Sequence, residues 1–410
     1  MLDIRHNVSY LLTAVAAADA SGQPTTPIIR AYLAARQESG QTFPVVEGEK
    51  VTFLYVGRRG GPDTNVILSA ERDSWPDSGP RFTRLGTSAL YHHAEHLDRG
   101  ARFLYRLEVN GRRIADPLNP REALREQWAP KSELWMPDYR QAPERTPQPS
   151  VPSGQVTTHT MPSAALRQDR ELFIYTPPGY DPRLDGRQYP FVLFHDGGNY
   201  INYAGAPTIL DNLIAAGRIP PVVAAFVSPV RRNWEYHLND AFTTFCADEV
   251  PAFVSAKYPG VTTDPARRAV VGASSGGMVS VFTAWSRPDV YGAVGAFSCY
   301  TSLQGYRLLK LIDAAPLRPV RFHLVAGHYE RHLWPGYPEG SPGDILDNSR
   351  RLAAVLAAKG YEHRAAEYYD GHNWGFWADH LPEVLRWLLG ESSVVSRRSS
   401  VETNGAPRAG

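Results

Sequence analysis

The chain has 410 residues, of which 43 are lysine or arginine and 42 are aspartate or glutamate, leaving a formal net charge of +1. This balance excludes the strong overall field with which proteins attract nucleic acid or an anionic membrane, so we expect neither as a partner. The length is that of two domains. Two cysteines, Cys246 and Cys299, are too few for a disulfide framework, and we expect two buried free thiols.

Two helices are the first predicted elements, at 8–18 and 26–36. The first of these runs is apolar enough to suggest a signal peptide. However, Asp3 precedes it, the region before it is weakly basic, and a second helical run follows it. We therefore expect a helical pair and a cytoplasmic protein. No apolar run approaches the roughly 18 residues that span a bilayer.

Short strands separated by turns follow the helical pair. Asn110-Gly111 is a strong hairpin signal beside the last of these strands. The predicted strands are 51–56, 65–68, 89–91 and 102–109. This spacing predicts a β-sandwich that ends near 116–120, and a proline-rich linker follows at 137–154. Residues 1–150 are therefore predicted to form an N-terminal domain with its linker.

Strands and helices alternate in the second half of the chain. The predicted strands are 171–176, 191–194, 222–227, 269–271 and 322–325, and the helices are 209–216, 248–258, 278–285, 350–359 and 382–389. Continuous apolar strands in such an alternation predict an α/β domain with a mostly parallel sheet that is covered on both faces. We assign this domain to 151–391 and predict a disordered tail at 392–410.

The sequence Gly272-Ala273-Ser274-Ser275-Gly276, followed by Gly277, stands between an apolar strand and a helical run. A nucleophile elbow requires this context, since a tight strand-to-helix turn presents a serine hydroxyl to a base. Small residues around the serine let the backbone turn that sharply. We predict that Ser274 is a catalytic nucleophile.

A serine nucleophile needs a base and an orienting carboxylate, which follow it in this chain order in α/β-hydrolases. His372 lies after a glycine in a loop before the last helix, and we choose it as the base. Glu330 leaves a late strand and is our choice for the carboxylate. Asp344 and Asp347 on the same segment are alternatives, whereas Asp370 is too close to His372 in sequence and is assigned to capping its own loop.

The oxyanion hole is expected to use the backbone N–H of Ser275 and a second N–H from the loop after an early strand. That loop is His195-Asp196-Gly197-Gly198-Asn199. Gly198 is the preferred second donor and Gly197 is close behind it. Asp196 either contacts the substrate or makes a structural hydrogen bond to its own loop.

Further residues are candidates for substrate binding. Arg232 offers a positive charge, and tryptophans offer an aromatic cleft, although core packing is the ordinary role of any single tryptophan. The candidates are Asp196, Arg232, Trp234, Trp334 and Trp374. The histidine-rich stretch at 92–96 matches no familiar metal site, and no glycine-rich phosphate loop is present. We therefore expect neither metal nor cofactor.

The C-terminal region resembles the Putative esterase family of α/β-hydrolases, and within it the enterochelin (ferric enterobactin) esterases. The matching motifs run in the family's order and cover nearly all of 155–390: 175–180, 196–198, 209–214, 217–221, 248–251, 272–277, 327–330, 371–372 and Trp377. The resemblance implies an immunoglobulin-like sandwich before the hydrolase domain. It also implies that Ser274, Glu330 and His372 are the catalytic triad, with Gly198 and Ser275 as the oxyanion pair.

We therefore expect a serine esterase that acts through an acyl-enzyme on a small-molecule ester. A siderophore trilactone, a feruloyl or acetyl sugar ester, and a small acyl ester are all candidate substrates, and acyl transfer to an alcohol stays open. A non-enzymatic alternative is a glycan- or partner-binding protein with a dormant hydrolase domain. The sequence does not specify the oligomeric state.

Overall fold

The computed structural model describes residues 7–57, 64–73, 79–123, 130–181, 188–331 and 342–390. The chain folds into two compact units, one built mainly from residues up to Arg140 together with Tyr369–Gly371, and one built mainly from Gln141 onward. The predicted tail at 392–410 and Trp334 lie outside the described residues.

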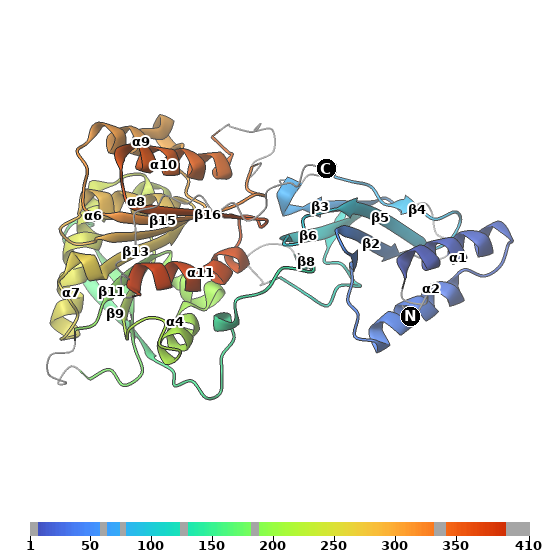
Figure 1. The fold of residues 1–410 in the computed structure, drawn as a ribbon, viewed down its shortest axis with the longest axis horizontal. Helices are drawn as coiled ribbons and strands as arrows, with labels where there is room; N and C mark the ends of the chain where they lie inside the picture. The colour runs from blue at the N-terminus through green and yellow to red at the C-terminus, as the bar shows by residue number, and fades with distance from the viewer. Residues whose placement is uncertain are drawn as a thin grey trace. The chain divides into compact units, whose positions relative to one another are not determined.

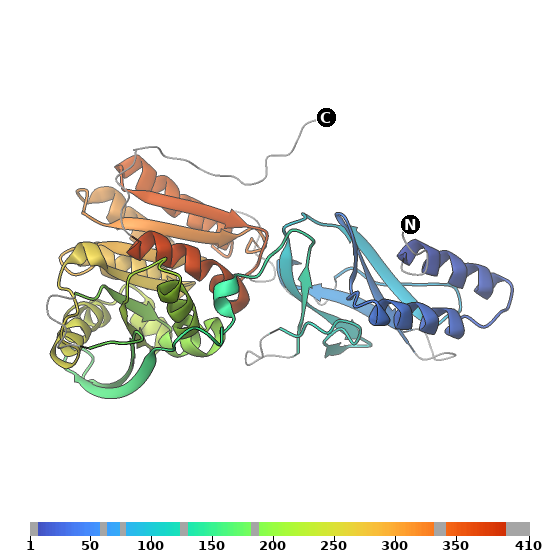
Figure 2. The ribbon, with the colours of Figure 1, turned by 60° about the horizontal axis from the view of Figure 1, so that its bottom comes forward.

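The N-terminal unit begins with the predicted helical pair, α1 (Val8–Ala20) and α2 (Thr26–Glu38). The Asn7 side chain accepts a hydrogen bond from the Tyr10 amide and so caps the first turn of α1. Apolar residues of both helices pack on the first sheet of this unit through Val45, Leu54 and Leu90. The pair is drawn in dark blue in Figures 1 and 2.

Two antiparallel sheets make up the rest of this unit, in agreement with the predicted sandwich. The first has the strand order β1-β2-β5-β4, and the second has β3-β6-β7 with β8 paired to β6. Their bounds are β1 Val45–Glu47, β2 Lys50–Val56, β3 Val66–Ala70, β4 Thr83–Arg84, β5 Leu90–His96, β6 Arg102–Val109, β7 Arg112–Ile114 and β8 Ser132–Trp135. Buried rings join the two sheets: Phe53 on β2 meets Tyr105 on β6 edge to face at 5.1 Å between centroids.

The second unit is built on an eight-stranded sheet with the order β16-β15-β14-β13-β11-β12-β10-β9. Strands β9 and β10 are antiparallel to their neighbours, and the other six strands are parallel. The bounds are β9 Gln155–Ser163, β10 Gln168–Thr176, β11 Phe191–His195, β12 Val223–Val227, β13 Arg268–Ala273, β14 Ala293–Phe297, β15 Arg321–Gly327 and β16 His363–Tyr368. The mostly parallel α/β sheet that the sequence predicts is therefore present.

Helices cover both faces of this sheet because alternate strand residues point to opposite sides. On β11, Phe191 and Leu193 join one core cluster, whereas Val192 and Phe194 join the other. The first cluster holds α6 (Asp240–Thr244), α7 (Val250–Lys257), α8 (Ser275–Ser286), α9 (Leu303–Ala314) and α10 (Ile345–Lys359), and the second holds α4 (Ala206–Ala215) and α11 (Trp374–Leu389). Figure 1 shows α9 and α10 on one side of the sheet and α4 and α11 on the other.

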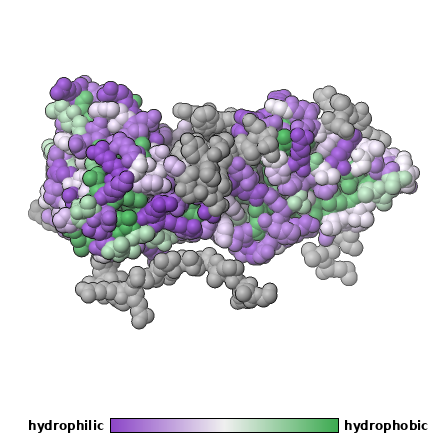
Figure 3. All heavy atoms as spheres, turned by 90° about the horizontal axis from the view of Figure 1, so that it is seen from above, coloured by the Kyte–Doolittle hydropathy of each residue, from purple (hydrophilic) through white to green (hydrophobic). Residues whose placement is uncertain are grey.

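No helix among the described residues is both long enough and apolar enough to cross a bilayer. On the face of the molecule seen in Figure 3, hydrophobic residues lie in small groups between hydrophilic ones. Cys246 and Cys299 are buried free thiols, as predicted.

Candidate active site

Ser274 stands at the turn between β13 and α8, where the sequence predicts a nucleophile elbow. Its backbone has φ 59° and ψ −125°, a region that residues other than glycine seldom adopt. The Ser274 amide donates to the Phe297 carbonyl at 2.9 Å, and the Ser274 carbonyl accepts from the Met278 amide at 3.1 Å. These bonds stabilise the strained turn, and Ser274 is half-buried at the carboxyl end of β13.

The glycines two positions before and two after the serine let the backbone of the turn pack on itself and let the Asp196 side chain approach it closely. A Cβ atom on Gly272 would lie 2.3 Å from the Gly276 carbonyl oxygen, and one on Gly276 would lie 2.8 Å from Asp196 Oδ2. Neither distance is compatible with a side chain. The glycines of the motif are thus explained by packing within the turn and against Asp196.

Glu330 and His372 form the second part of the candidate site. His372 Nδ1 lies 2.8 Å from Glu330 Oε1, and the Gly327 amide donates to Glu330 Oε2 at 2.8 Å. Glu330 is fully buried, whereas the His372 side chain is 18% exposed. Because a carboxylate accepts hydrogen bonds, the proton of the neutral imidazole lies on Nδ1 and Nε2 is left as the free base.

Because their strands are parallel, these residues lie at the same end of the sheet, where the strands have their carboxyl ends. Ser274, Glu330 and His372 follow the carboxyl ends of β13, β15 and β16, and β14 runs between β13 and β15. The Trp377 ring meets the His372 ring edge to face at 5.0 Å and donates from Nε1 to Ser298 Oγ at 2.8 Å. Ser298 directly follows Phe297, the residue whose carbonyl accepts from the Ser274 amide, so a series of contacts connects His372 to the Ser274 turn.

The other carboxylates considered from the sequence have structural partners. Asp344 caps α10 by accepting from the Asp347 amide at 2.8 Å, and Asp347 pairs with Arg351 one helical turn further on. Asp370 accepts from the Gly371 amide at 2.7 Å, which is the loop-capping role we expected. Among the contacts found in the described part of the chain, it is the Glu330 carboxylate that lies within hydrogen-bond distance of His372.

The predicted oxyanion donors lie on two helix starts. Ser275 is the first residue of α8, where backbone N–H groups have no acceptor within the helix. Gly198 lies in α3 (Gly197–Asn199), the short turn after β11, and its amide donates to Ser228 Oγ at 3.0 Å. A substrate oxyanion would therefore have to replace Ser228 Oγ as the acceptor of the Gly198 N–H. The order of preference between these two neighbouring glycines stays a prediction.

Asp196 precedes this turn and is bound by Arg232 of α5 (Arg232–Tyr236). Arg232 Nε and Nη2 donate to its two carboxylate oxygens at 2.9 and 2.8 Å. Burial opposes the charge of Arg232, but the hydrogen bonds and the charge of Asp196 outweigh it and raise the pKa of the guanidinium. Asp196 therefore makes structural contacts of two kinds: its side chain binds Arg232, and its backbone carbonyl accepts from amides of its own loop.

The tryptophans proposed for substrate binding lie in different surroundings. Trp234 is 45% exposed on α5, and the Arg231 guanidinium stacks over it at 4.5 Å. Trp374 is buried between Tyr200 and Trp377, at centroid distances of 5.1 and 4.8 Å. Trp374 thus takes part in the core, whereas Trp234 is partly exposed beside Arg231.

His195, the last residue of β11, is a fully buried part of the scaffold. Ser280 Oγ donates to the Gly276 carbonyl at 2.7 Å, so it accepts from His195 Nδ1–H at 2.8 Å, and Cys246 Sγ lies 3.6 Å from Nε2. Burial, with a smaller contribution from the Arg232 charge, lowers the pKa of His195 to about 3. Burial also raises the pKa of the Cys246 thiol, so this thiol is a poor nucleophile.

Comparison with known proteins shows the family to which the chain belongs. A family model described as Putative esterase matches residues 163–388, more than half of the 410-residue chain, so the chain belongs to this esterase family. The iron(III) enterobactin esterase of Dickeya dadantii is 26% identical over 294 residues, which cover 67% of this chain and 65% of that protein.

Two solved structures share the fold. The ferric enterobactin esterase of Salmonella typhimurium is 19% identical with a TM-score of 0.68, covering 83% of this chain and 93% of that chain. The enterobactin esterase of Shigella flexneri, solved in the presence of enterobactin, is 20% identical with a TM-score of 0.65, covering 83% and 92%. The predicted family and fold class are therefore confirmed.

Sequence reasoning missed three residues that hold the site. Ser228 binds the Gly198 amide, the Tyr236 hydroxyl accepts from the Asp196 amide at 2.8 Å, and Glu235 anchors α5. All three lie within 228–236, a segment without a familiar motif. In that segment, the adjacent arginines 231 and 232 were the feature that suggested a role in the site. The sequence did not indicate which side chain would bind Asp196.

Proposed function

We propose that this protein is a serine esterase in which Ser274 is the nucleophile, His372 the general base and Glu330 the orienting carboxylate. The observation that carries the proposal is the buried Glu330 carboxylate bound to His372 Nδ1 at 2.8 Å, at the strand ends beside the Ser274 turn. Residues 151–391 would form the catalytic domain. The cytoplasmic location stays a prediction.

The reaction follows from these groups. His372 Nε2 accepts the Ser274 proton as the hydroxyl oxygen attacks the ester carbonyl, and the Glu330 charge stabilises the imidazolium. The amide of Ser275, with that of Gly197 or Gly198, would bind the oxyanion. The imidazolium then gives its proton to the leaving alkoxide, which leaves an acyl-enzyme. Water, deprotonated by His372, releases the acid and restores Ser274.

The substrate we propose to test first is a siderophore ester. Support comes from the Dickeya dadantii relative, named an iron(III) enterobactin esterase, and from the Shigella flexneri structure solved in the presence of enterobactin. Trp234 is exposed and could contact an aromatic group of such a substrate. Feruloyl or acetyl sugar esters, and acyl transfer to an alcohol, are alternatives that a substrate panel separates.

Ser274→Ala tests the proposal directly. We expect loss of p-nitrophenyl butyrate hydrolysis and of labelling by a fluorophosphonate probe, with unchanged thermal unfolding. Ser286→Ala, at the opposite end of α8, is the matched control and should keep wild-type activity. Full activity of Ser274→Ala would refute the proposal. A wild-type protein that neither hydrolyses esters nor reacts with the probe would instead support a dormant hydrolase domain.

A further inference from the structure

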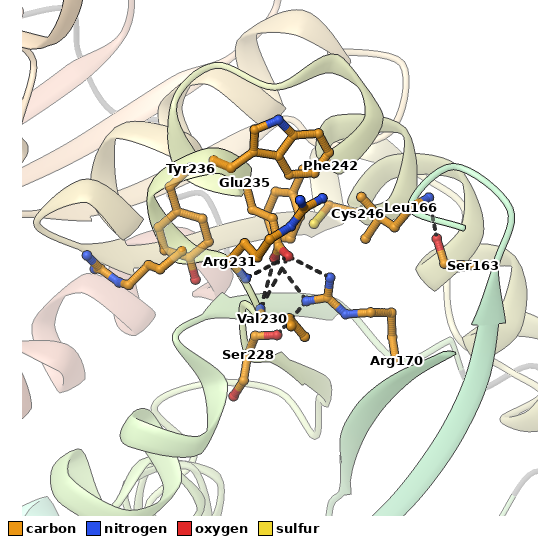
Figure 4. Close-up of polar contacts among 12 residues, drawn as sticks. Ser163, Leu166, Arg170, Ser228, Val230, Arg231, Glu235, Tyr236, Phe242 and Cys246 are labelled. Carbon is orange, nitrogen blue, oxygen red and sulfur yellow. Dashed lines mark hydrogen bonds and ion pairs between the residues drawn. The ribbon is translucent and has the colours of Figure 1, made fainter. Parts of the chain in front are cut away.

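Helix α5 is fixed to the sheet by a buried ion pair. Arg170 on β10 donates from Nη1 and Nη2 to the two carboxylate oxygens of Glu235, both at 3.0 Å, and the two side chains are 1% and 0% exposed. Glu235 Oε1 also accepts from the Arg231 amide at 3.1 Å, and the Val230 amide lies 3.2 Å from both oxygens. Figure 4 shows these bonds converging on the Glu235 carboxylate. Because all these donors meet one buried carboxylate, the start of α5 is held in one position.

Two side chains of α5 bind Asp196 from this fixed position. Arg232 makes the bidentate contact with its carboxylate, and the Tyr236 hydroxyl accepts its backbone N–H at 2.8 Å. The Arg232 guanidinium also lies over the Tyr236 ring at 5.0 Å. The side chain and the backbone of Asp196 are therefore both held by α5.

Asp196 in turn determines where the oxyanion loop begins. Its backbone is left-handed, with φ 55° and ψ 42°, a conformation that is sterically unfavourable for a residue other than glycine. Its carbonyl accepts from the amides of Asn199 and Tyr200 at 2.9 and 3.1 Å, so the turn through Gly197 starts on it. Asp196 Oδ2 lies against Gly276, where a Cβ would come within 2.8 Å. One carboxylate thus contacts both α5 and the nucleophile turn.

We infer that Asp196 and Arg232 are positioning residues, which set the distance between the oxyanion loop and the Ser274 turn instead of binding the substrate. The inference rests on the proposed esterase function. An oxyanion donor must lie about 2.7–3.1 Å from the developing charge, and a displacement of about 1 Å costs on the order of 100-fold in rate. The Arg232 charge is already balanced by Asp196, so a substrate anion would meet a neutral pair.

The test separates transition-state stabilisation from substrate binding. In the full-length protein, we expect Arg232→Met to lower kcat for p-nitrophenyl butyrate about 10- to 100-fold while KM changes less than about twofold. A boronic acid, which forms a tetrahedral adduct on the serine, should lose affinity by the same factor as kcat. Arg232→Lys, which keeps the charge and one donor group, should recover part of kcat.

Arg287→Met is the matched control. Arg287 binds Asp289 through the same two nitrogens, Nε at 3.0 Å and Nη2 at 2.8 Å, just beyond the far end of α8. Its loss should leave kcat, KM and boronic acid affinity at wild-type values. The control therefore reports what breaking a bidentate arginine–aspartate pair does away from the site.

Two outcomes would overturn the inference and leave the esterase function intact. A raised KM with unchanged kcat would mean that Arg232 binds the substrate, and wild-type kinetics in Arg232→Met would mean that the pair positions nothing. If Arg232→Met does not fold, Asp196→Asn, which keeps the shape of the side chain, carries the same expectations for kcat, KM and the boronic acid. Failure of the proposed function is recognised separately, because wild-type protein would then show neither turnover nor probe labelling.

Discussion

Glu330→Gln replaces the hydrogen-bond acceptor that faces His372 Nδ1 with a hydrogen-bond donor. The Gly327 amide donates to Oε2 at 2.8 Å, so a glutamine must place its carbonyl oxygen there. Its NH₂ group then takes the place of Oε1, 2.8 Å from His372 Nδ1. An amide donor at Nδ1 moves the ring proton to Nε2, which can no longer accept the Ser274 proton.

The expected fall in kcat of Glu330→Gln has two causes. Loss of a hydrogen bond to a charged group is worth about 1.5–3 kcal/mol, or roughly 10- to 150-fold. The wrong tautomer adds to this, and the corresponding aspartate-to-asparagine change in a Ser-His-Asp protease lowers kcat about 10⁴-fold, or about 5.4 kcal/mol. We therefore expect a fall of between about 10³- and 10⁴-fold in kcat.

The assay is p-nitrophenyl butyrate hydrolysis under saturating substrate, with the rate of fluorophosphonate labelling as a second readout. Glutamine has the shape of glutamate and keeps both contacts, so we expect thermal unfolding close to that of the wild type. Asp347→Asn makes the same change in charge at a carboxylate that pairs with Arg351, and it should keep activity. Activity of Glu330→Gln within about tenfold of wild type would refute the assignment of Glu330.

Two further predictions concern stability. Burial lowers the pKa of His323 to about 4, and no described residue forms a hydrogen bond with either ring nitrogen. The folded state therefore binds fewer protons than the unfolded state, and stability present above about pH 6.5 falls as the pH drops, by about 3.4 kcal/mol below pH 4. His323→Phe should reduce this dependence in urea unfolding at pH 8, 6.5 and 5, and an unchanged slope would show that His323 is not its source. Glu235→Gln leaves the buried Arg170 guanidinium without a counter-charge and should cost about 3–5 kcal/mol; a free energy of unfolding within about 1 kcal/mol of wild type would contradict the anchoring of α5 by this pair.

The strands of the second unit differ in how readily the sequence predicts them. Buried strands such as β11, with Phe191-Val192-Leu193-Phe194, are continuous apolar runs. The edge strand β16 is His363-Arg364-Ala365-Ala366-Glu367-Tyr368, and it carries no such run because it is only half buried. β9 was likewise not predicted: it lies at the opposite edge, and its residues 155–160 are mostly exposed. Their place in the sheet follows from pairing with a neighbour, which local composition does not encode.

The sequence alone determined the family, the α/β fold class and the residues proposed as the triad. It could do so because a strand-to-helix turn limits the residues around Ser274 to small ones, and because chain order restricts where Glu330 and His372 can stand. Contacts between residues far apart in the sequence were decided only by the tertiary structure. Arg232 reaches Asp196 from 36 residues away, and Arg170 reaches Glu235 from 65 residues away. The sequence shows that these side chains are charged, but only strand order and packing determine which of the many opposite charges each one meets.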